Sequence, residues 1–143
     1  MQHKIHFETL GCKLNQIESE SIAKSFVDEG FDCTMEAITA KQDSCYNTIL
    51  CIINTCTVTS KAEQKARRII RLLLEKFPKS VVIVTGCYTE VEADSIEKID
   101  SRIAVLKGTA KDALADYPNI IKKYLEENSS YGAKDFSTFL KNN

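Results

Sequence analysis

Short apolar runs alternate with amphipathic stretches along most of the chain. The pattern of five of these runs predicts strands. These strands are expected at residues 4–10, 31–36, 48–54, 81–85 and 103–106. The runs 49–53 and 81–84 are apolar at every position, so we expect both to be buried on two faces at the centre of a sheet.

The stretches between the strands carry helix start signals. A cap residue followed three positions later by an acid satisfies free backbone N–H groups at a helix start. Four such pairs occur, namely Asn15 with Glu18, Ser60 with Glu63, Thr89 with Glu92, and Thr109 with Asp112. Gly30 is placed to end the first helix, and Pro118 to begin a short helix that reaches about Glu127.

This alternation predicts an α/β fold with a mostly parallel five-stranded sheet and helices on both faces. We expect three layers, α/β/α, in the flavodoxin-like strand order 2-1-3-4-5. The first strand alternates polar Lys4, His6 and Glu8 with apolar residues, so its polar face is expected to be exposed, and His3 and His6 to face solvent.

One domain is expected over residues 1–127. From residue 128 the composition shifts to Ser, Gly, Asn and Lys with isolated aromatics, which predicts a linker over 128–143 that lies outside the core.

Composition narrows the class of protein. Hydrophobic residues make up 43% and charged residues 27% of the 143 residues, which excludes a disordered chain. No apolar run approaches the roughly 20 residues that span a bilayer, and the start lacks a signal-peptide pattern. We therefore expect a cytoplasmic protein with no membrane partner. The net charge of −1 gives no overall attraction to nucleic acid.

Three of the six cysteines, Cys12, Cys56 and Cys87, follow predicted strands directly. In the order 2-1-3-4-5 those strands are neighbours, and ligands bind outside their carboxyl ends. Cysteines in a reducing compartment bind metals, catalyse or pack in a core, and disulfides are rare there. Three thiolates predict an iron–sulfur cluster whose fourth iron has no protein ligand. Packing is the competing interpretation, since free cysteine is often buried.

The other three cysteines favour simpler roles. Cys33 and Cys51 lie within predicted strands, where core packing is expected. Cys45 lies in a loop and is either a fourth cluster ligand or an incidental exposed thiol. Gly11 and Gly86 precede two of the predicted ligands and would let the backbone approach a cluster closely.

Three sequence words carry a family resemblance: TLGCKLNQ at 9–16, INTCTVT at 53–59 and VTGCY at 84–88. Together they resemble the N-terminal domain of the radical-SAM methylthiotransferases, over about residues 1–127. The Gly-Cys-Lys-x-Asn-Gln form is most similar to the branch that thiomethylates N6-threonylcarbamoyladenosine next to the tRNA anticodon.

The resemblance implies that Cys12, Cys56 and Cys87 ligate an auxiliary [4Fe-4S] cluster, whose open iron supplies or holds the sulfur to be inserted. It also implies S-adenosylmethionine and a second [4Fe-4S] cluster in a radical-SAM domain, which would generate the radical that abstracts hydrogen from adenine C2. The implied partners are tRNA and the enzyme's own radical-SAM and C-terminal RNA-binding domains.

This sequence departs from the family pattern because it contains no Cys-x-x-x-Cys-x-x-Cys motif. Residues 139–141 resemble the words that precede that motif in the family. The chain therefore looks like an N-terminal fragment with a linker at 128–143 toward a missing radical-SAM domain, and it is expected to be inactive alone.

Three other functions compete with this one. A cysteine phosphatase needs an arginine shortly after its nucleophile, which Cys12, Cys56 and Cys87 all lack. An FMN protein needs a Ser/Thr/Gly-rich phosphate loop, and residues 13–18 offer little of one. A docking module could use residues 61–79, which hold seven basic residues and two acids. That basic surface is either a solvated face, a tRNA contact or a docking site for another domain.

Overall fold

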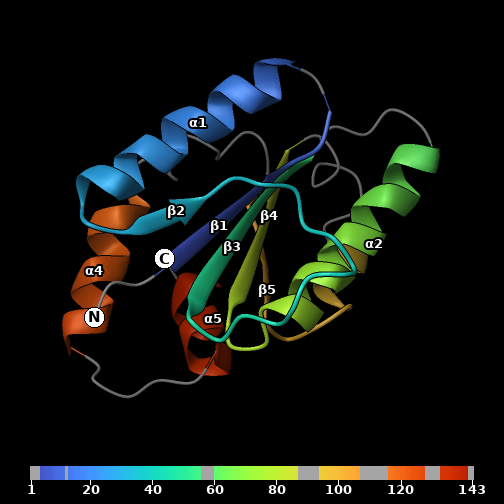
Figure 1. Ribbon diagram of the computed structural model, residues 1–143. Helices are drawn as coiled ribbons and strands as arrows, with labels where there is room; N and C mark the ends of the chain where they lie inside the picture. The colour runs from blue at the N-terminus through green and yellow to red at the C-terminus, as the bar shows by residue number, and fades with distance from the viewer. Residues whose placement is uncertain are drawn as a thin grey trace.

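The computed structural model describes residues 4–11, 13–55, 60–86, 94–106, 116–127 and 133–141 (Figure 1). Its strands and helices follow the alternation that the sequence predicts. In chain order they are β1 (Lys4–Thr9), α1 (Lys13–Asp28), β2 (Asp32–Thr34), β3 (Thr48–Thr55), α2 (Ser60–Lys76), β4 (Val81–Gly86), β5 (Ile103–Val105), α4 (Tyr117–Glu127) and α5 (Ala133–Lys141).

The sheet has the order β2-β1-β3-β4-β5, and each neighbouring pair is parallel. This confirms the predicted fold class and strand order. All residues of β3 and β4 are buried, as expected for the two runs that are apolar on both faces. Each observed strand differs from the predicted one by one or two residues at one end or at both.

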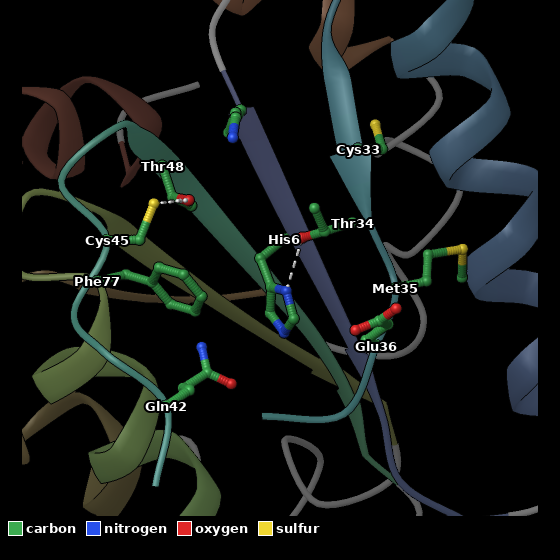
Figure 2. Close-up of a pocket in the computed structure, with 10 residues that line it drawn as sticks. His6, Cys33, Thr34, Met35, Glu36, Gln42, Cys45, Thr48 and Phe77 are labelled. Atoms are coloured by element: carbon green, nitrogen blue, oxygen red, sulfur yellow. Dashed lines mark hydrogen bonds between the residues drawn. The ribbon is translucent and has the colours of Figure 1, made fainter. Parts of the chain in front are cut away.

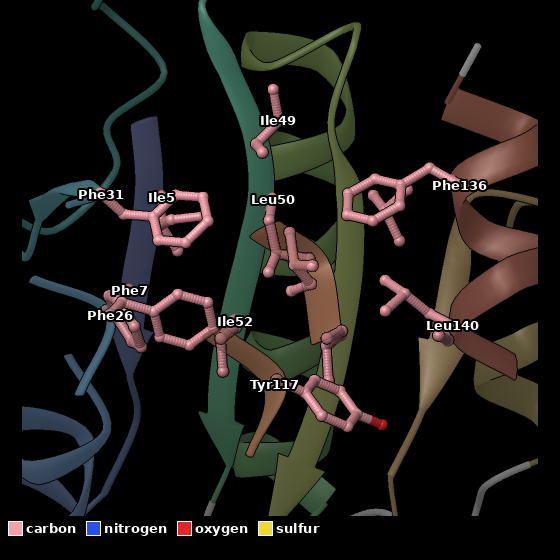
Figure 3. Close-up of a cluster of buried hydrophobic side chains, with 14 of the residues drawn as sticks. Ile5, Phe7, Phe26, Phe31, Ile49, Leu50, Ile52, Tyr117, Phe136 and Leu140 are labelled. Atoms are coloured by element: carbon pink, nitrogen blue, oxygen red, sulfur yellow. The ribbon is translucent and has the colours of Figure 1, made fainter. Parts of the chain in front are cut away.

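Helices cover both faces of the sheet (Figure 1). Helices α1, α4 and α5 lie on one face, where Phe26, Tyr117 and Phe136 pack against strand residues such as Leu50 and Ile52 (Figure 3). Helix α2 lies on the other face and contributes the buried residues Ala66, Ile69, Ile70, Leu73 and Leu74. The result is the predicted three-layer α/β/α arrangement.

Helix α2 begins at Ser60, as its cap signal predicts. Its other end is closed by Arg102, just before β5. The guanidinium donates hydrogen bonds to the backbone carbonyls of Leu74, Phe77, Pro78 and Ser80, at 2.8, 3.1, 2.7 and 3.2 Å. The last carbonyls of a helix have no partner within the helix, so this side chain supplies a donor to Leu74 in the last turn of α2 and to the residues that follow the helix.

Helix α1 begins at Lys13, two residues earlier than the Asn15 cap signal predicts. The Asn15 side chain does not cap the helix, since its amide donates to backbone carbonyls outside it. Gly30 follows the end of α1 with a φ of 95°, as predicted for a helix-ending glycine. The pairs Thr89 with Glu92 and Thr109 with Asp112 lie outside the described residues.

Residues beyond 127 were predicted to lie outside the core, and this is wrong for α5. Phe136 and Leu140 are buried in the hydrophobic cluster that residues of α1, α4 and the sheet also form. The ring of Tyr124 in α4 stacks on Phe136 and Phe139, with centroid distances of 5.4 and 4.3 Å. Ser137 Oγ donates to the Ser101 carbonyl at 3.0 Å. The folded unit therefore continues past residue 127, because helical spacing aligns these apolar residues on one face.

The expected exposure of β1 is also wrong. His6 and Glu8 are buried, with 3% and 4% of their surface exposed, because α2 and the chain after β2 cover that face of the strand. Their polar atoms are paired with each other, as described below. His3 lies outside the described residues.

Candidate metal centre at the carboxyl edge of the sheet

The predicted ligands Cys12, Cys56 and Cys87 lie outside the described residues. The residues that lead into them are described, and they share one edge of the sheet. Thr9 pairs with Asn54, and Asn54 pairs with Thr85, across three adjacent strands. Neighbouring strands lie about 4.8 Å apart, so the ends of β1, β3 and β4 fall within roughly 10 Å of one another.

The pairing of β3 with β4 extends to the last residues of both strands, where Thr55 lies opposite Gly86. These two residues immediately precede Cys56 and Cys87 in the sequence. The first strand follows the same edge past its end, since the Leu10 N–H donates to the Asn54 carbonyl at 2.8 Å. The chain thus enters all three cysteine segments from one side of the sheet.

Gly86 is required where these strands end. Its φ is 107°, a backbone conformation that side chains other than glycine rarely adopt. A Cβ at this position would lie 2.0 Å from the Thr55 carbonyl oxygen and 2.7 Å from the Thr55 nitrogen. Only glycine therefore allows the close approach of the two strand ends that lead into Cys56 and Cys87.

Two buried asparagines join the edge to the first turns of α1. Asn15 Nδ2 donates to the carbonyls of Leu10 at 3.1 Å and of Thr55 at 3.4 Å. Asn54 Nδ2 donates to the Asn15 carbonyl at 3.2 Å and approaches Ser19 Oγ at 3.5 Å. Each asparagine thereby ties β3 to α1, and Asn15 also holds the end of β1. The amides fix the position of the segments that flank Cys12 and Cys56.

Hydroxyl groups extend this polar layer. Thr9 Oγ1 donates to Ser19 Oγ at 2.7 Å, and Thr55 Oγ1 donates to the Thr85 carbonyl at 2.8 Å. Thr85 Oγ1 is buried and has no hydrogen-bond partner among the described residues. A buried, unpaired hydroxyl two positions before Cys87 is a donor of the kind that stabilises sulfur ligands around a metal.

These observations fit an iron–sulfur group held by thiolates. The predicted ligands are three cysteines, and the strand ends that lead to them present backbone and neutral polar groups. Among the described residues, the Thr85 hydroxyl at this edge has no hydrogen-bond partner. Within the described ranges, no three histidine, cysteine or acidic side chains gather in a way that could hold a metal ion.

Cys45 lies at the opposite edge of the sheet. Its Sγ is 3.6 Å from Oγ1 of Thr48, the first residue of β3. At 3.3 Å per residue, β3 carries the chain about 23 Å from Thr48 to Thr55. Cys45 is therefore too far from the edge that precedes Cys56 to be a fourth ligand of the same cluster, and the alternative of an incidental thiol stands.

Burial separates the three described thiols in acidity. Cys51 is fully buried in β3, and this burial raises its pKa to about 12. Half-buried Cys33 has a pKa of about 11, because burial and the nearby Asp32 charge both disfavour its thiolate. Partial burial also acts to raise the pKa of Cys45, but hydrogen bonds from Thr48 and the Asn47 backbone outweigh it and lower that pKa. Packing is confirmed as the setting of Cys51.

A pocket of about 500 Å³ lies on the α2 side of β1, beside Cys45 and His6 (Figure 2). His6 Nδ1 is 2.9 Å from Thr34 Oγ1, and Nε2 is 2.9 Å from Glu8 Oε1. Glu8 Oε1 also accepts a hydrogen bond from the Ile38 N–H at 3.0 Å. Both ring nitrogens are engaged, so His6 supports the wall of this pocket and has no nitrogen left to bind a metal.

The sequence profile of the uncharacterized protein family UPF0004 matches residues 4–108, which include all three cysteine words. The chain belongs to this family. Its curated relatives include threonylcarbamoyladenosine tRNA methylthiotransferases from Treponema pallidum, 48% identical over 85% of this chain, and from Aquifex aeolicus, 31% identical over 86%. The aligned parts are 24% and 27% of those proteins.

A more distant relative belongs to another branch. The tRNA-2-methylthio-N(6)-dimethylallyladenosine synthase of Christiangramia forsetii is 31% identical over 86% of this chain and 24% of its own length. The UPF0004 chain thus spans about a quarter of the curated relatives that it matches. The resemblance to the N-terminal domain of methylthiotransferases, inferred from the three sequence words, is confirmed.

In the described part of the chain, none of the helices is long and apolar enough to cross a membrane.

Proposed function

We propose that this chain is the cluster-binding N-terminal domain of a tRNA methylthiotransferase that acts at C2 of N6-threonylcarbamoyladenosine. The family match and the names of several relatives support a role in tRNA methylthiolation. The choice of nucleoside rests on the form of the first cysteine word and on the relative from Treponema pallidum.

The observation that carries this proposal is the adjacency of β1, β3 and β4. Their paired ends lead into Cys12, Cys56 and Cys87 from one edge of the sheet. These cysteines would hold a [4Fe-4S] cluster through three thiolates. When bound, the cluster would provide the sulfur, or the site that holds the sulfur, for insertion into the nucleoside.

The other residues at this edge have supporting tasks. Gly86 lets the chains before Cys56 and Cys87 approach each other, and Asn15 and Asn54 hold α1 against the strand ends. The Thr85 hydroxyl is available to donate a hydrogen bond to a sulfur ligand. Free thiolates require a reducing compartment, so we place the protein in the cytosol.

S-adenosylmethionine and a second [4Fe-4S] cluster would be bound by a radical-SAM domain outside this chain. A C-terminal domain would contribute further contacts to tRNA. The isolated chain would therefore bind a cluster without completing the reaction.

The proposal is tested by nucleoside analysis of tRNA from host cells whose own gene carries Cys56→Ala or Cys87→Ala. We expect 2-methylthio-N6-threonylcarbamoyladenosine to disappear and its unmodified precursor to accumulate. Cys45→Ala is the matched control, because that thiol lies at the other edge of the sheet, and it should leave the modification intact. Persistence of the methylthio group in either of the first two strains would contradict the proposal.

A further inference from the structure

We infer that the exposed face of α2 binds the phosphate backbone of the RNA substrate. The binding surface consists of Lys61, Lys65, Arg68 and Arg71, which we call the basic stripe. This inference rests on the proposed function, since it assigns a surface of this chain to the tRNA that the enzyme would modify.

Charge is strongly segregated in this protein. Residues 61–79 contain seven of the 19 basic residues and only two of the 20 acidic residues. That segment therefore has a formal charge of +5, whereas the rest of the chain has −6. The near-zero net charge hides this separation. A local positive surface on an otherwise acidic protein attracts a polyanion to one place and orients it there.

The stripe lies on the side of α2 that faces away from the sheet. Ala66, Ile69, Ile70 and Leu73 are buried against the strands, while all four residues of the stripe are exposed. Spacings of three and four residues put neighbouring stripe residues one helical turn apart. From Lys61 to Arg71 the stripe runs about 15 Å along the helix.

The four side chains of the stripe form no ion pair with any residue that the structure describes. Among the described residues, ion pairs join His6 with Glu8, Arg102 with Asp100, and Lys122 with Glu29. None of these involves the stripe. Glu75 is the exposed acid next along the same face, and it follows Arg71 at the end remote from Lys61. The four positive charges are thus available to a ligand.

The position of α2 relative to the predicted cluster favours RNA as that ligand. The helix begins at Ser60, four residues after Cys56, at the carboxyl edge of the sheet. It ends at the amino edge, where the Lys76 carbonyl accepts a hydrogen bond from the Cys45 N–H at 2.7 Å. The stripe therefore starts beside the proposed chemistry and extends away from it. If a nucleoside of the RNA reached the carboxyl edge of the sheet, where the predicted cysteine ligands follow the strands, its neighbouring backbone phosphates would lie near the first turns of α2.

Binding of the 143-residue chain to a synthetic RNA hairpin with an anticodon stem and loop tests the inference. The key variant is Lys65→Gln/Arg68→Gln, and the matched control is Lys24→Gln/Lys123→Gln, which removes two exposed charges from α1 and α4. Affinity is measured by fluorescence anisotropy over a range of salt concentrations. All four side chains are exposed, so circular dichroism and thermal unfolding should match those of the wild type.

Each phosphate contact contributes roughly 0.7 to 0.9 to the slope of log K against log salt. Loss of two contacts should therefore weaken binding roughly 25- to 60-fold at about 0.1 M salt and reduce the slope by about 1.4 to 1.8. The control should change both values far less.

Equal losses in the two double variants would overturn the inference, because the stripe would then be a solvated face or a docking site for another domain. Absence of hairpin binding by the wild type at low salt would overturn it too. The proposed function is judged separately from nucleoside analysis and iron content, which do not depend on the stripe.

Discussion

Substitution of Gly86 by alanine tests whether the close approach of β3 and β4 builds the metal centre. The added Cβ would lie 2.0 Å from the Thr55 carbonyl oxygen, within a pair of buried strands. Backbone atoms cannot rotate away from a clash as a flexible side chain can. The ends of the two strands must therefore separate, and they are the residues that lead into Cys56 and Cys87.

Gly30 supplies a matched control for the backbone conformation. It has a φ of 95°, close to the 107° of Gly86, but a Cβ there would meet nothing within 4 Å. Gly30→Ala should therefore cost only the conformational strain, about 1 to 2 kcal/mol. Gly86→Ala adds an overpacking cost of about 1 to 3 kcal/mol. We expect a total of about 2 to 5 kcal/mol for Gly86→Ala.

Urea unfolding followed by circular dichroism measures both free energies of unfolding. A second readout is the iron bound after anaerobic reconstitution, which should fall in Gly86→Ala and remain at the wild-type level in Gly30→Ala. Thermal midpoints should fall roughly 3 to 4 °C for each kcal/mol lost in a chain of this size. Equal stability losses in the two variants, with full iron binding in both, would refute the reasoning.

Three further substitutions or treatments probe other contacts. Asn54→Ala should lower the free energy of unfolding by about 2 kcal/mol in urea titrations and weaken iron retention, because the buried Asn15 carbonyl loses the Asn54 amide as a donor. An unchanged urea midpoint would show that this hydrogen bond does not hold α1 against β3. Arg102→Met should lower the free energy of unfolding by about 2 to 3 kcal/mol in the same titration, because it removes the donor to the carbonyls of Leu74 and Pro78. Bound iron should not fall, because these carbonyls lie far from the carboxyl edge of the sheet. Iodoacetamide near pH 8 should label Cys45 well before Cys51, as measured by mass spectrometry of peptides. The lowered pKa of Cys45 gives more thiolate at that pH than the pKa of about 12 of Cys51. Faster labelling of Cys51 would contradict this order.

The sheet could be predicted from sequence because its signals are local. Parallel strands buried on both faces appear as unbroken apolar runs, and β3 and β4 carry such runs. The order then follows from the few topologies that right-handed crossovers allow. The convergence of the strand ends near Thr55 and Gly86 could be predicted for the same reason.

The burial of His6 and Glu8 could not be predicted, because it depends on residues distant in sequence. Phe77 directly follows α2, and its ring centroid lies 5.0 Å from that of His6, while the Ile38 N–H donates a hydrogen bond to Glu8 Oε1. A strand with one polar face looks the same in sequence whether water or a polar pair covers that face. Only tertiary contacts decide between the two.

Helix α5 was missed because its apolar residues are few and its flanking sequence is polar. Phe136, Phe139 and Leu140 have helical spacing, but a short stretch of this kind is also typical of a linker. Its stability comes from packing against Tyr124 and the sheet. The role of Asn15 could not be predicted for a related reason. Asparagine is a common helix cap, and only its position in the fold shows that its amide donates to the Leu10 carbonyl instead.

The central claim is that Cys12, Cys56 and Cys87 form one three-thiolate site. The most direct measurement is iron and acid-labile sulfide per chain after anaerobic reconstitution, for the wild type, for each of the three cysteine-to-alanine variants, and for Cys45→Ala. We predict about four irons and four sulfides in the wild type and in Cys45→Ala, with loss in each of the other three. Retention of the full cluster in any of those three variants, or its loss in Cys45→Ala, would contradict the account.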